Sequence, residues 1–356
     1  MTIGAPRSWS RGGGLPADAF AVVMATGIVA IAARDTDHTV VSAVLVVTAS
    51  VALGVLALWS AIGVAATGTA VAAGPDPLAR SLLLFSAVAA CDVVAACLGS
   101  DRVVSAVLGT VAVVLWLVLV PRALAALCSR PRGSRGEGAR GGWLLAAVAT
   151  ESLALTAAHL ARAGVLVPVL LGVALACWAL GLAVYVVIAV PVVRRVVASR
   201  GDVEVLGPDL WVLMGGLAIA TVAGSSVVVA TRAAGVFPEV PGVLAPALVG
   251  LWVLGTAWIP GLVVAEVRRV RRVGWHYERG RWATVFPVGM YSASCSWLAG
   301  VLAGPRAADD LDETTAVLPP LLRGAGHVAF WVALVAWCVV TVGLVRRARR
   351  HPSSLP

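Results

Sequence analysis

Residues 40–66 read VVSAVLVVTASVALGVLALWSAIGVAA, a run of 27 residues without a charged side chain. A helix needs about 20 apolar residues to cross a hydrocarbon core of about 30 Å, and in lipid its backbone polar groups must be satisfied internally. This stretch is therefore expected to cross a membrane. Nine similar stretches accompany it with little sequence between them, and the ten expected spans are 17–33, 40–66, 80–98, 103–127, 143–161, 165–193, 208–230, 243–265, 282–304 and 325–345.

The composition agrees with an integral membrane protein, because 60% of the 356 residues are hydrophobic and only 13% are charged. The net charge of +9 comes from arginines confined to particular loops, so nucleic acid is not expected as a partner. The six cysteines lie in or beside apolar stretches, with no CxxC pair and no histidine at metal spacing. We therefore expect no metal and no other cofactor.

The arginines predict the orientation, because cytoplasmic loops are enriched in them. The terminal tails and the loops after the second, fourth, sixth and eighth spans hold 21 of the 27 arginines. Both termini are thus expected in the cytoplasm, with tails at 1–16 and 346–356 flanking a transmembrane domain at 17–345 in the plasma membrane. The opposite side has Arg34, Arg102, Arg162, Arg232, Arg306 and Arg323, with an acidic cluster at Asp309, Asp310, Asp312 and Glu313.

The first span has a second interpretation. Arg7 and Arg11 precede it and small residues stand near its end, as in a cleaved signal peptide. A transmembrane helix is the preferred interpretation, because the tail ahead of it is rich in glycine and the span carries a motif discussed below.

Short loops at 99–102 and 162–164 join neighbouring spans into antiparallel pairs. The expected fold is thus an all-α integral membrane protein, with ten transmembrane helices arranged as five helical hairpins around a central pore. Repeated hairpins around a shared axis are a common plan among transporters.

The ninth span, RWATVFPVGMYSASCSWLAG at 281–300, is the most distinctive. Pro287 removes a backbone donor and crowds the preceding turn, so the helix is expected to kink near Phe286. A bulky ring at a kink, with mostly small residues beyond it on the same face, is typical of a pore that closes by dewetting. Packing of Phe286 against a neighbouring helix is the other interpretation.

Asp92 and Glu151 are the carboxylates deep in apolar stretches, where ionised groups are costly and usually face a cavity or a partner. For Glu151, functional and structural roles stay open, and for Asp92 a buried pairing role is preferred. His159 lies about 80° round the helix from Glu151, so the two are not an obvious relay and His159 is expected at the interface.

Small residues gather in the first, seventh and ninth spans, which suits either close helix packing or a lumen that leaves room for an anion. Their concentration in these spans, rather than in the bulkier even-numbered ones, favours a lumen. The candidate pore-lining residues are Thr26, Gly27, Phe85, Asp92, Glu151, Gly215, Thr221, Gly289 and Ala293, with Phe286 and Pro287 as the candidate gate.

Four segments carry a resemblance to a known family: FAVVMATGIVAIA at 20–32, GGWLLAAVATESLAL at 141–155, PDLWVLMGGLAIATVAGSS at 208–226 and WATVFPVGMYS at 282–292. The chain resembles the tellurite-resistance/C4-dicarboxylate transporter family over residues 16–347. That family includes plant slow anion channels, fungal malate permeases and sulfite efflux pumps.

The resemblance implies that odd-numbered helices line a pore while even-numbered helices form an outer ring. It also implies a homotrimer with one pore per subunit, and a gate at the phenylalanine before the proline of the ninth helix, which falls on Phe286. Its substrates range over chloride, nitrate, sulfite, malate and tellurite.

The expected function is transport of small anions, by a channel or by a proton-coupled carrier. A bare carboxylate repels an anion unless it is protonated or paired, so Glu151 is expected to face the lumen and to change protonation during transport. A membrane enzyme is disfavoured because no polar catalytic cluster stands out, and a sensor or scaffold because no soluble output domain is evident.

Overall fold

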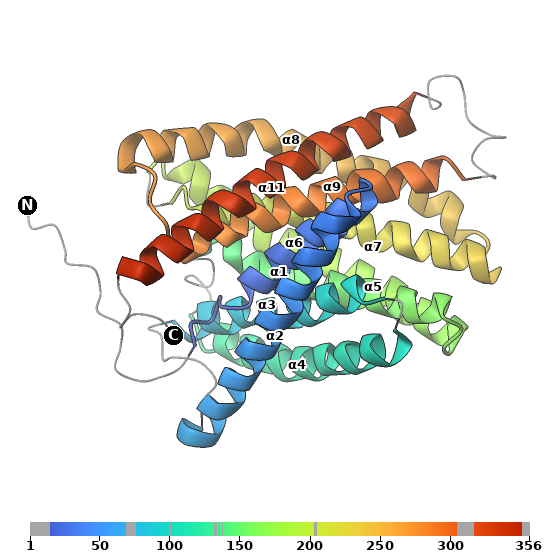
Figure 1. The fold of residues 1–356 in the computed structure, drawn as a ribbon, viewed down its shortest axis with the longest axis horizontal. Helices are drawn as coiled ribbons and strands as arrows, with labels where there is room; N and C mark the ends of the chain where they lie inside the picture. The colour runs from blue at the N-terminus through green and yellow to red at the C-terminus, as the bar shows by residue number, and fades with distance from the viewer. Residues whose placement is uncertain are drawn as a thin grey trace, which may run out of the picture.

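The computed structural model is all α-helical over the residues it describes, which are 15–68, 76–99, 101–131, 134, 136, 138–202, 205–304 and 317–350. Each expected span corresponds to one helix (Figure 1). These are α1 (Ala21–Asp35), α2 (Thr39–Thr67), α3 (Pro77–Cys97), α4 (Arg102–Cys128), α5 (Leu145–Arg162), α6 (Val167–Ala198), α7 (Val212–Ala234), α8 (Val240–Val273), α9 (Trp282–Leu302) and α11 (Leu318–Arg350).

Within the described ranges, nine of these helices are long and apolar enough to cross a membrane, and α1, with 15 residues, is the short one. Residues 17–20, expected as the start of the first span, form a turn ahead of α1. At the other end, α11 continues to Arg350, so residues 346–350, expected in a tail, are helical. The acidic cluster at 309–313 and residues 1–14 of the expected N-terminal tail lie outside the described residues.

Burial separates the helices into an inner and an outer set. In the most apolar windows of α3, α5, α7 and α9, 78% to 94% of residues are buried, and most of α1 is buried as well. The corresponding share is 17% to 28% for α2, α4, α6, α8 and α11, whose exposed side chains are largely valine and leucine. The outer helices therefore present the apolar surface that lipid requires.

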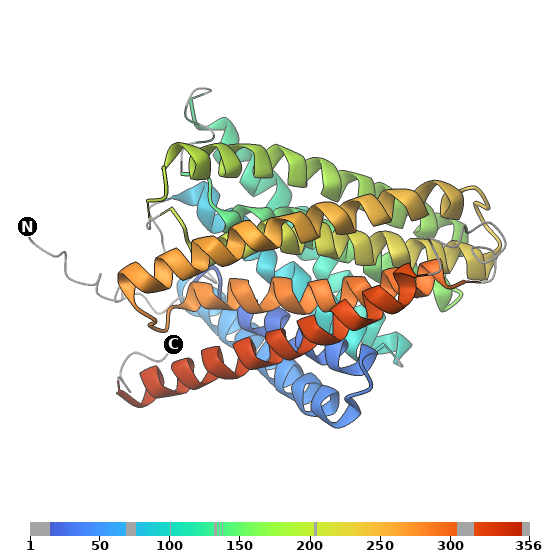
Figure 2. The ribbon, with the colours of Figure 1, turned by 90° about the horizontal axis from the view of Figure 1, so that it is seen from above.

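The inner helices form a closed ring, because α1 packs on α3, α3 on α5, α5 on α7, α7 on α9, and α9 again on α1. Each inner helix also packs on the outer helix that follows it in the chain, and α9 pairs with α11 in this way (Figures 1 and 2). The predicted plan of ten helices in five hairpins is confirmed.

Glycines allow the ring helices to approach closely. A Cβ at Gly27 would lie 2.5 Å from Cγ1 of Val93, across the α1–α3 contact. At Gly215 it would lie 2.9 Å from Cβ of Pro287, across the α7–α9 contact. A Cβ at Gly289 in α9 would lie 3.0 Å from Cγ2 of Ile28, across the α9–α1 contact. At these three candidate pore-lining positions, the missing side chain would point at a neighbouring helix.

Short 3-10 turns close the arginine-rich end of the ring, where η2 (Gly141–Leu144), η3 (Pro208–Trp211) and η4 (Arg279–Arg281) lead into α5, α7 and α9. The N–H of Gly142 donates to Oδ2 of Asp209 at 3.0 Å, and a Cβ at Gly141 would overlap the backbone carbonyl of Asp209. The starts of α5 and α7 are thus held together through backbone contact.

Replacing Gly141 with alanine should therefore destabilise the protein by about 2 kcal/mol, because backbone atoms have to move to admit the methyl group. Thermal unfolding in detergent measures this effect. Gly172→Ala in α6 is the matched control, since none of the described atoms lies within 4 Å of a Cβ there. The control should be neutral or slightly stabilising, and equal melting temperatures for the two variants would contradict the proposed role of Gly141.

Candidate functional site

A cavity of about 350 Å³ lies inside the ring, toward the end at which the inner helices finish. All five inner helices line it, with Ile31 from α1, Asp92 from α3, Ser152 from α5, Val222 from α7 and Ala293 from α9 among the lining residues. The cavity is thus a feature of the ring axis, and one chain suffices to build it.

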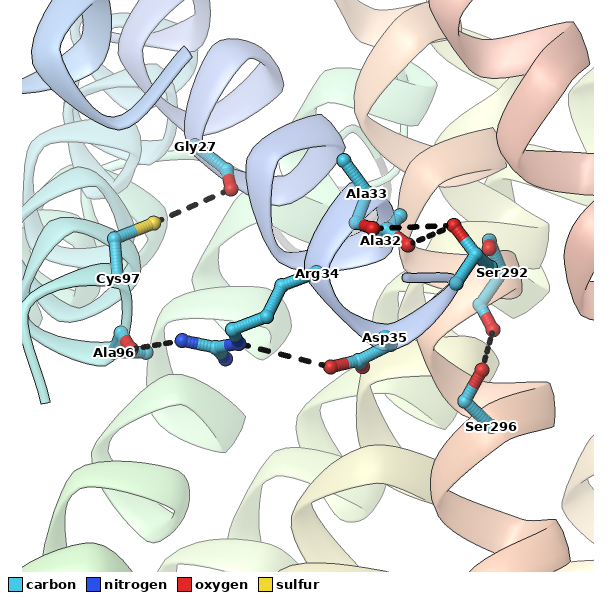
Figure 3. Close-up of polar contacts among 10 residues, drawn as sticks. Gly27, Ala32, Ala33, Arg34, Asp35, Ala96, Cys97, Ser292 and Ser296 are labelled. Carbon is cyan, nitrogen blue, oxygen red and sulfur yellow. Dashed lines mark hydrogen bonds and ion pairs between the residues drawn. The ribbon is translucent and has the colours of Figure 1, made fainter. Parts of the chain in front are cut away.

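The mouth of this cavity is cationic. Arg34 of α1 extends toward α3, where its Nη1 donates to the carbonyl of Ala96 at 3.4 Å, and its Nε lies 3.8 Å from Oδ1 of Asp35 (Figure 3). Arg162 of α5 lies over the ring of Trp297 in α9, 5.8 Å from its centroid. These two guanidinium groups favour the entry of anions, and the half-buried His159 lies beside them.

Asp92 lies deeper in the cavity and is almost fully buried, with 3% of its surface exposed. Two hydroxyls of α5 hold its carboxylate: Thr156 Oγ1 donates to Oδ1 at 2.6 Å, and Ser152 Oγ lies 2.6 Å from Oδ2. Among the described residues that line the cavity, Asp92 is the acidic one. An anion that enters at the mouth would next meet this carboxyl group.

Phe286 lies on the cavity-facing side of α9. Met290, Ala293 and Trp297 line the cavity, and Phe286 precedes Met290 by four residues. Residues four apart lie on one face of a helix, with a rise of about 6 Å between them. Phe286 is 2% exposed, so its ring is packed inside the protein, about one helical turn from Met290 toward the arginine-rich end.

The same helical register places other large side chains at this depth or further in. Phe85 precedes Asp92 by seven residues on α3, and Met24 precedes Ile28 by four on α1. Phe85 and Met24 are both buried, with 2% and 1% exposed. Below the cavity, the described part of the ring therefore contains bulky, buried apolar side chains.

The two candidate threonines direct their hydroxyls to helical backbone. Thr26 Oγ1 donates to the carbonyl of Val22 at 2.8 Å and accepts from the indole Nε1 of Trp337 in α11 at 3.0 Å. Thr221 donates to the carbonyl of Leu217 in its own helix at 2.8 Å. Thr26 thus faces the outer helix α11, away from the cavity.

Glu151 does not line the cavity, which differs from the expectation that it faces a lumen. Its Oε1 lies 2.5 Å from the position of a Cβ on Gly181, so the side chain points at α6. Both carboxyl oxygens are buried, and the described residues offer them no hydrogen-bond partner. The reason is rotational: adjacent residues differ by about 100° around a helix, so Ser152 faces Asp92 while Glu151 faces outward.

Several polar residues that line the cavity were not singled out from the sequence as pore-lining, among them Arg34, Arg162, Ser152, Thr156 and His159. Ser152, Thr156 and His159 follow one another at intervals of four and three residues, which places them on one face of α5. That spacing could have identified a polar stripe on α5. The structure places His159 in the cavity mouth, near the end of the helix, where an interfacial position was expected.

A closed ring of buried helices around a cavity with a cationic mouth defines a multi-pass membrane protein with an internal site for a small solute. A family model described as voltage-dependent anion channel matches residues 14–345. The chain belongs to this family, whose members transport anions across membranes, and the resemblance noted in the sequence is confirmed.

Two relatives match part of the chain, and both are described as uncharacterized membrane proteins. Rv1735c from Mycobacterium tuberculosis strain H37Rv and MT1776 from strain CDC 1551 are each 31% identical over 163 residues. The match covers 45% of this chain and 75% of each relative. Their descriptions agree with a membrane location.

Glu151→Gln should leave the pH profile of anion flux unchanged, because the carboxyl group lies against α6 and outside the cavity. Flux from liposomes that contain the purified protein, measured between pH 5 and pH 8 for wild type and variant, provides the measurement. A flux that varies with pH in wild type but not in Glu151→Gln would contradict this prediction and would show that Glu151 is the titrating group.

Proposed function

We propose that this protein moves small anions through the plasma membrane along the axis of its inner ring, and that Phe286 closes the path. The observation that carries the proposal is the order of groups along this axis: a cationic mouth, a cavity of about 350 Å³ and then a buried apolar layer. Membership of the voltage-dependent anion channel family supports the same function.

The placement of Phe286 supports its role as gate. It is buried at the depth where the cavity ends, on the face of α9 that lines the cavity. The following residue, Pro287, cannot donate a backbone hydrogen bond and contacts Gly215 of α7. An apolar constriction of this kind blocks ions because they would have to shed water within it.

Small inorganic anions such as chloride, nitrate, sulfite or tellurite, and C4-dicarboxylates such as malate, are the proposed substrates. The arginine distribution supports an orientation with both termini in the cytoplasm, which puts the cavity mouth on the opposite side of the membrane. The family resemblance also suggests a homotrimer in which each subunit keeps its own path. No covalent chemistry is proposed.

Phe286→Ala should raise anion flux, because it removes the ring that fills the path below the cavity. The expected stability cost is about 3 to 5 kcal/mol, as for other buried phenylalanines. Anion efflux from liposomes measures the flux, with replacement of chloride by nitrate, sulfite and malate to identify the preferred ion.

Phe330→Ala is the matched control, since Phe330 in α11 is equally buried but packs against His38 and Trp331 outside the ring. This variant should suffer a similar loss of stability without a gain in flux. A folded Phe286→Ala protein whose flux equals or falls below that of wild type would contradict the gate.

A further inference from the structure

Two hydroxyl groups, those of Ser152 and Thr156, make three short contacts around Asp92, but they have only two protons to donate. Ser152 Oγ lies 2.6 Å from Oδ2 of Asp92 and 2.8 Å from the carbonyl of Ala149, and a serine hydroxyl carries one proton. Thr156 donates to Oδ1 from the other side. One of the two short contacts of Ser152 therefore lacks a proton unless Asp92 supplies it.

A neutral Asp92 satisfies every atom of this cluster. Its Oδ2–H donates to Ser152 Oγ, the Ser152 hydroxyl donates to the Ala149 carbonyl, and Thr156 donates to Oδ1. An ionised Asp92 is also accommodated, because the Ser152 hydroxyl can turn from Ala149 to Oδ2. The cluster thus accepts a proton with the rotation of one hydroxyl and no movement of the backbone.

The cluster also lies where an anion has to pass. Asp92 and Ser152 line the cavity between the cationic mouth and the layer that contains Phe286. Arg34 contacts Ala96, which is one helical turn from Asp92 on α3, so about 6 Å along the helix axis separate that contact from the carboxyl-bearing residue. An ionised carboxylate at this distance opposes the attraction of the mouth.

We propose that Asp92, Ser152 and Thr156 form a proton-binding site within the anion path, and that anions pass when Asp92 holds a proton. This inference rests on the proposed function. It moves the protonation step expected for Glu151 to the carboxyl group that faces the cavity. The proton comes from solution and returns to it, so no other reactant is needed.

Several other charged or titratable groups surround Asp92 on the helices packed around it. His159 is the main competitor, because protonation of its ring on acidification would also draw anions in. Asp35 is the second, because protonation of its carboxylate would leave the positive charge of Arg34 without this nearby negative charge. Among the residues that the structure describes, these groups are Arg34 and Asp35 from α1, Cys91 and Cys97 from α3, Glu151, His159 and Arg162 from α5, and Cys177 from α6, and no charged side chain of α4 lines the cavity.

The test compares anion flux with pH for wild type and Asp92→Asn in liposomes. Wild-type flux should rise as pH falls, because the neutral form accumulates. Asp92→Asn should give high flux that does not vary with pH, about tenfold above wild type at the alkaline end, since one repelling charge is removed. The asparagine amide can donate to Ser152 while its oxygen accepts from Thr156, so it imitates the neutral network.

His159→Gln and Asp35→Asn are the matched controls, and both should keep the wild-type slope. An Asp92→Asn protein that retains this slope would overturn the proposal, and so would a slope that disappears in either control. Flux that is absent at every pH from both wild type and Phe286→Ala would overturn the proposed function itself, which is a different outcome from flux that ignores Asp92.

Thr156→Val provides a second variant that keeps Asp92 in place. The lost hydroxyl stabilises the ionised carboxylate more than the neutral acid, so the midpoint of the flux profile should move to higher pH. Infrared difference spectra between low and high pH should contain a carboxylic acid band that Asp92→Asn lacks. If Thr156→Val has the same flux midpoint as wild type, and its carboxylic acid band titrates as in wild type, the proposal is overturned even if Asp92→Asn fails to fold.

Discussion

Close contact between helices that lack bulky side chains at their interfaces is the constraint on which the ring depends. Lipid offers no hydrophobic force to bring helices together, so packing and interhelical contacts hold them. Gly27, Gly215 and Gly289 each leave room for an atom of the next inner helix, and Gly216 and Gly224 do the same for Tyr185 and for Trp178 of α6. The ring is thereby narrow enough for a few large side chains to close it.

This narrow ring forces its polar groups to be satisfied locally. Thr26, Thr150 and Thr221 each donate to the carbonyl four residues earlier in their own helix, which removes the cost of burying a hydroxyl. Thr156 instead reaches across to Asp92 on α3. The polar link between α3 and α5 thus serves to hold one particular carboxyl group, and helix packing alone does not require it.

The sequence predicted the ten helices and their pairing because length, apolarity and loop charge determine these features directly, whereas their inner and outer positions were implied by the family resemblance. It predicted the position of Glu151 and Asp92 along the helix axis equally well. What it could not predict was their rotation, since Glu151 and Ser152 are neighbours in the chain and yet face α6 and Asp92 respectively.

The same limit explains the other differences. Gly27, Gly215 and Gly289 suit a lumen and a close contact equally well by composition, and only the direction of the missing Cβ distinguishes the two. The cationic mouth combines residues of different hairpins, Arg34 with Arg162 and Trp297, and their proximity depends on how the ring closes. No local pattern in a single sequence contains that information.

Under the proposed function, the layer at Phe286 opens more easily when the phenyl side chain of Phe286 changes rotamer than when the whole of α9 is displaced. Pro287, one residue after Phe286, meets Gly215 of α7, and Gly289, three residues after Phe286, meets Ile28 of α1. A shift of the α9 backbone would therefore break both contacts. Close-packed interiors resist such shifts, whereas a side chain can change rotamer without them. The glycines that make the ring narrow enough to be closed by a few large side chains therefore also fix the helix that carries Phe286, which leaves its side chain as the movable part.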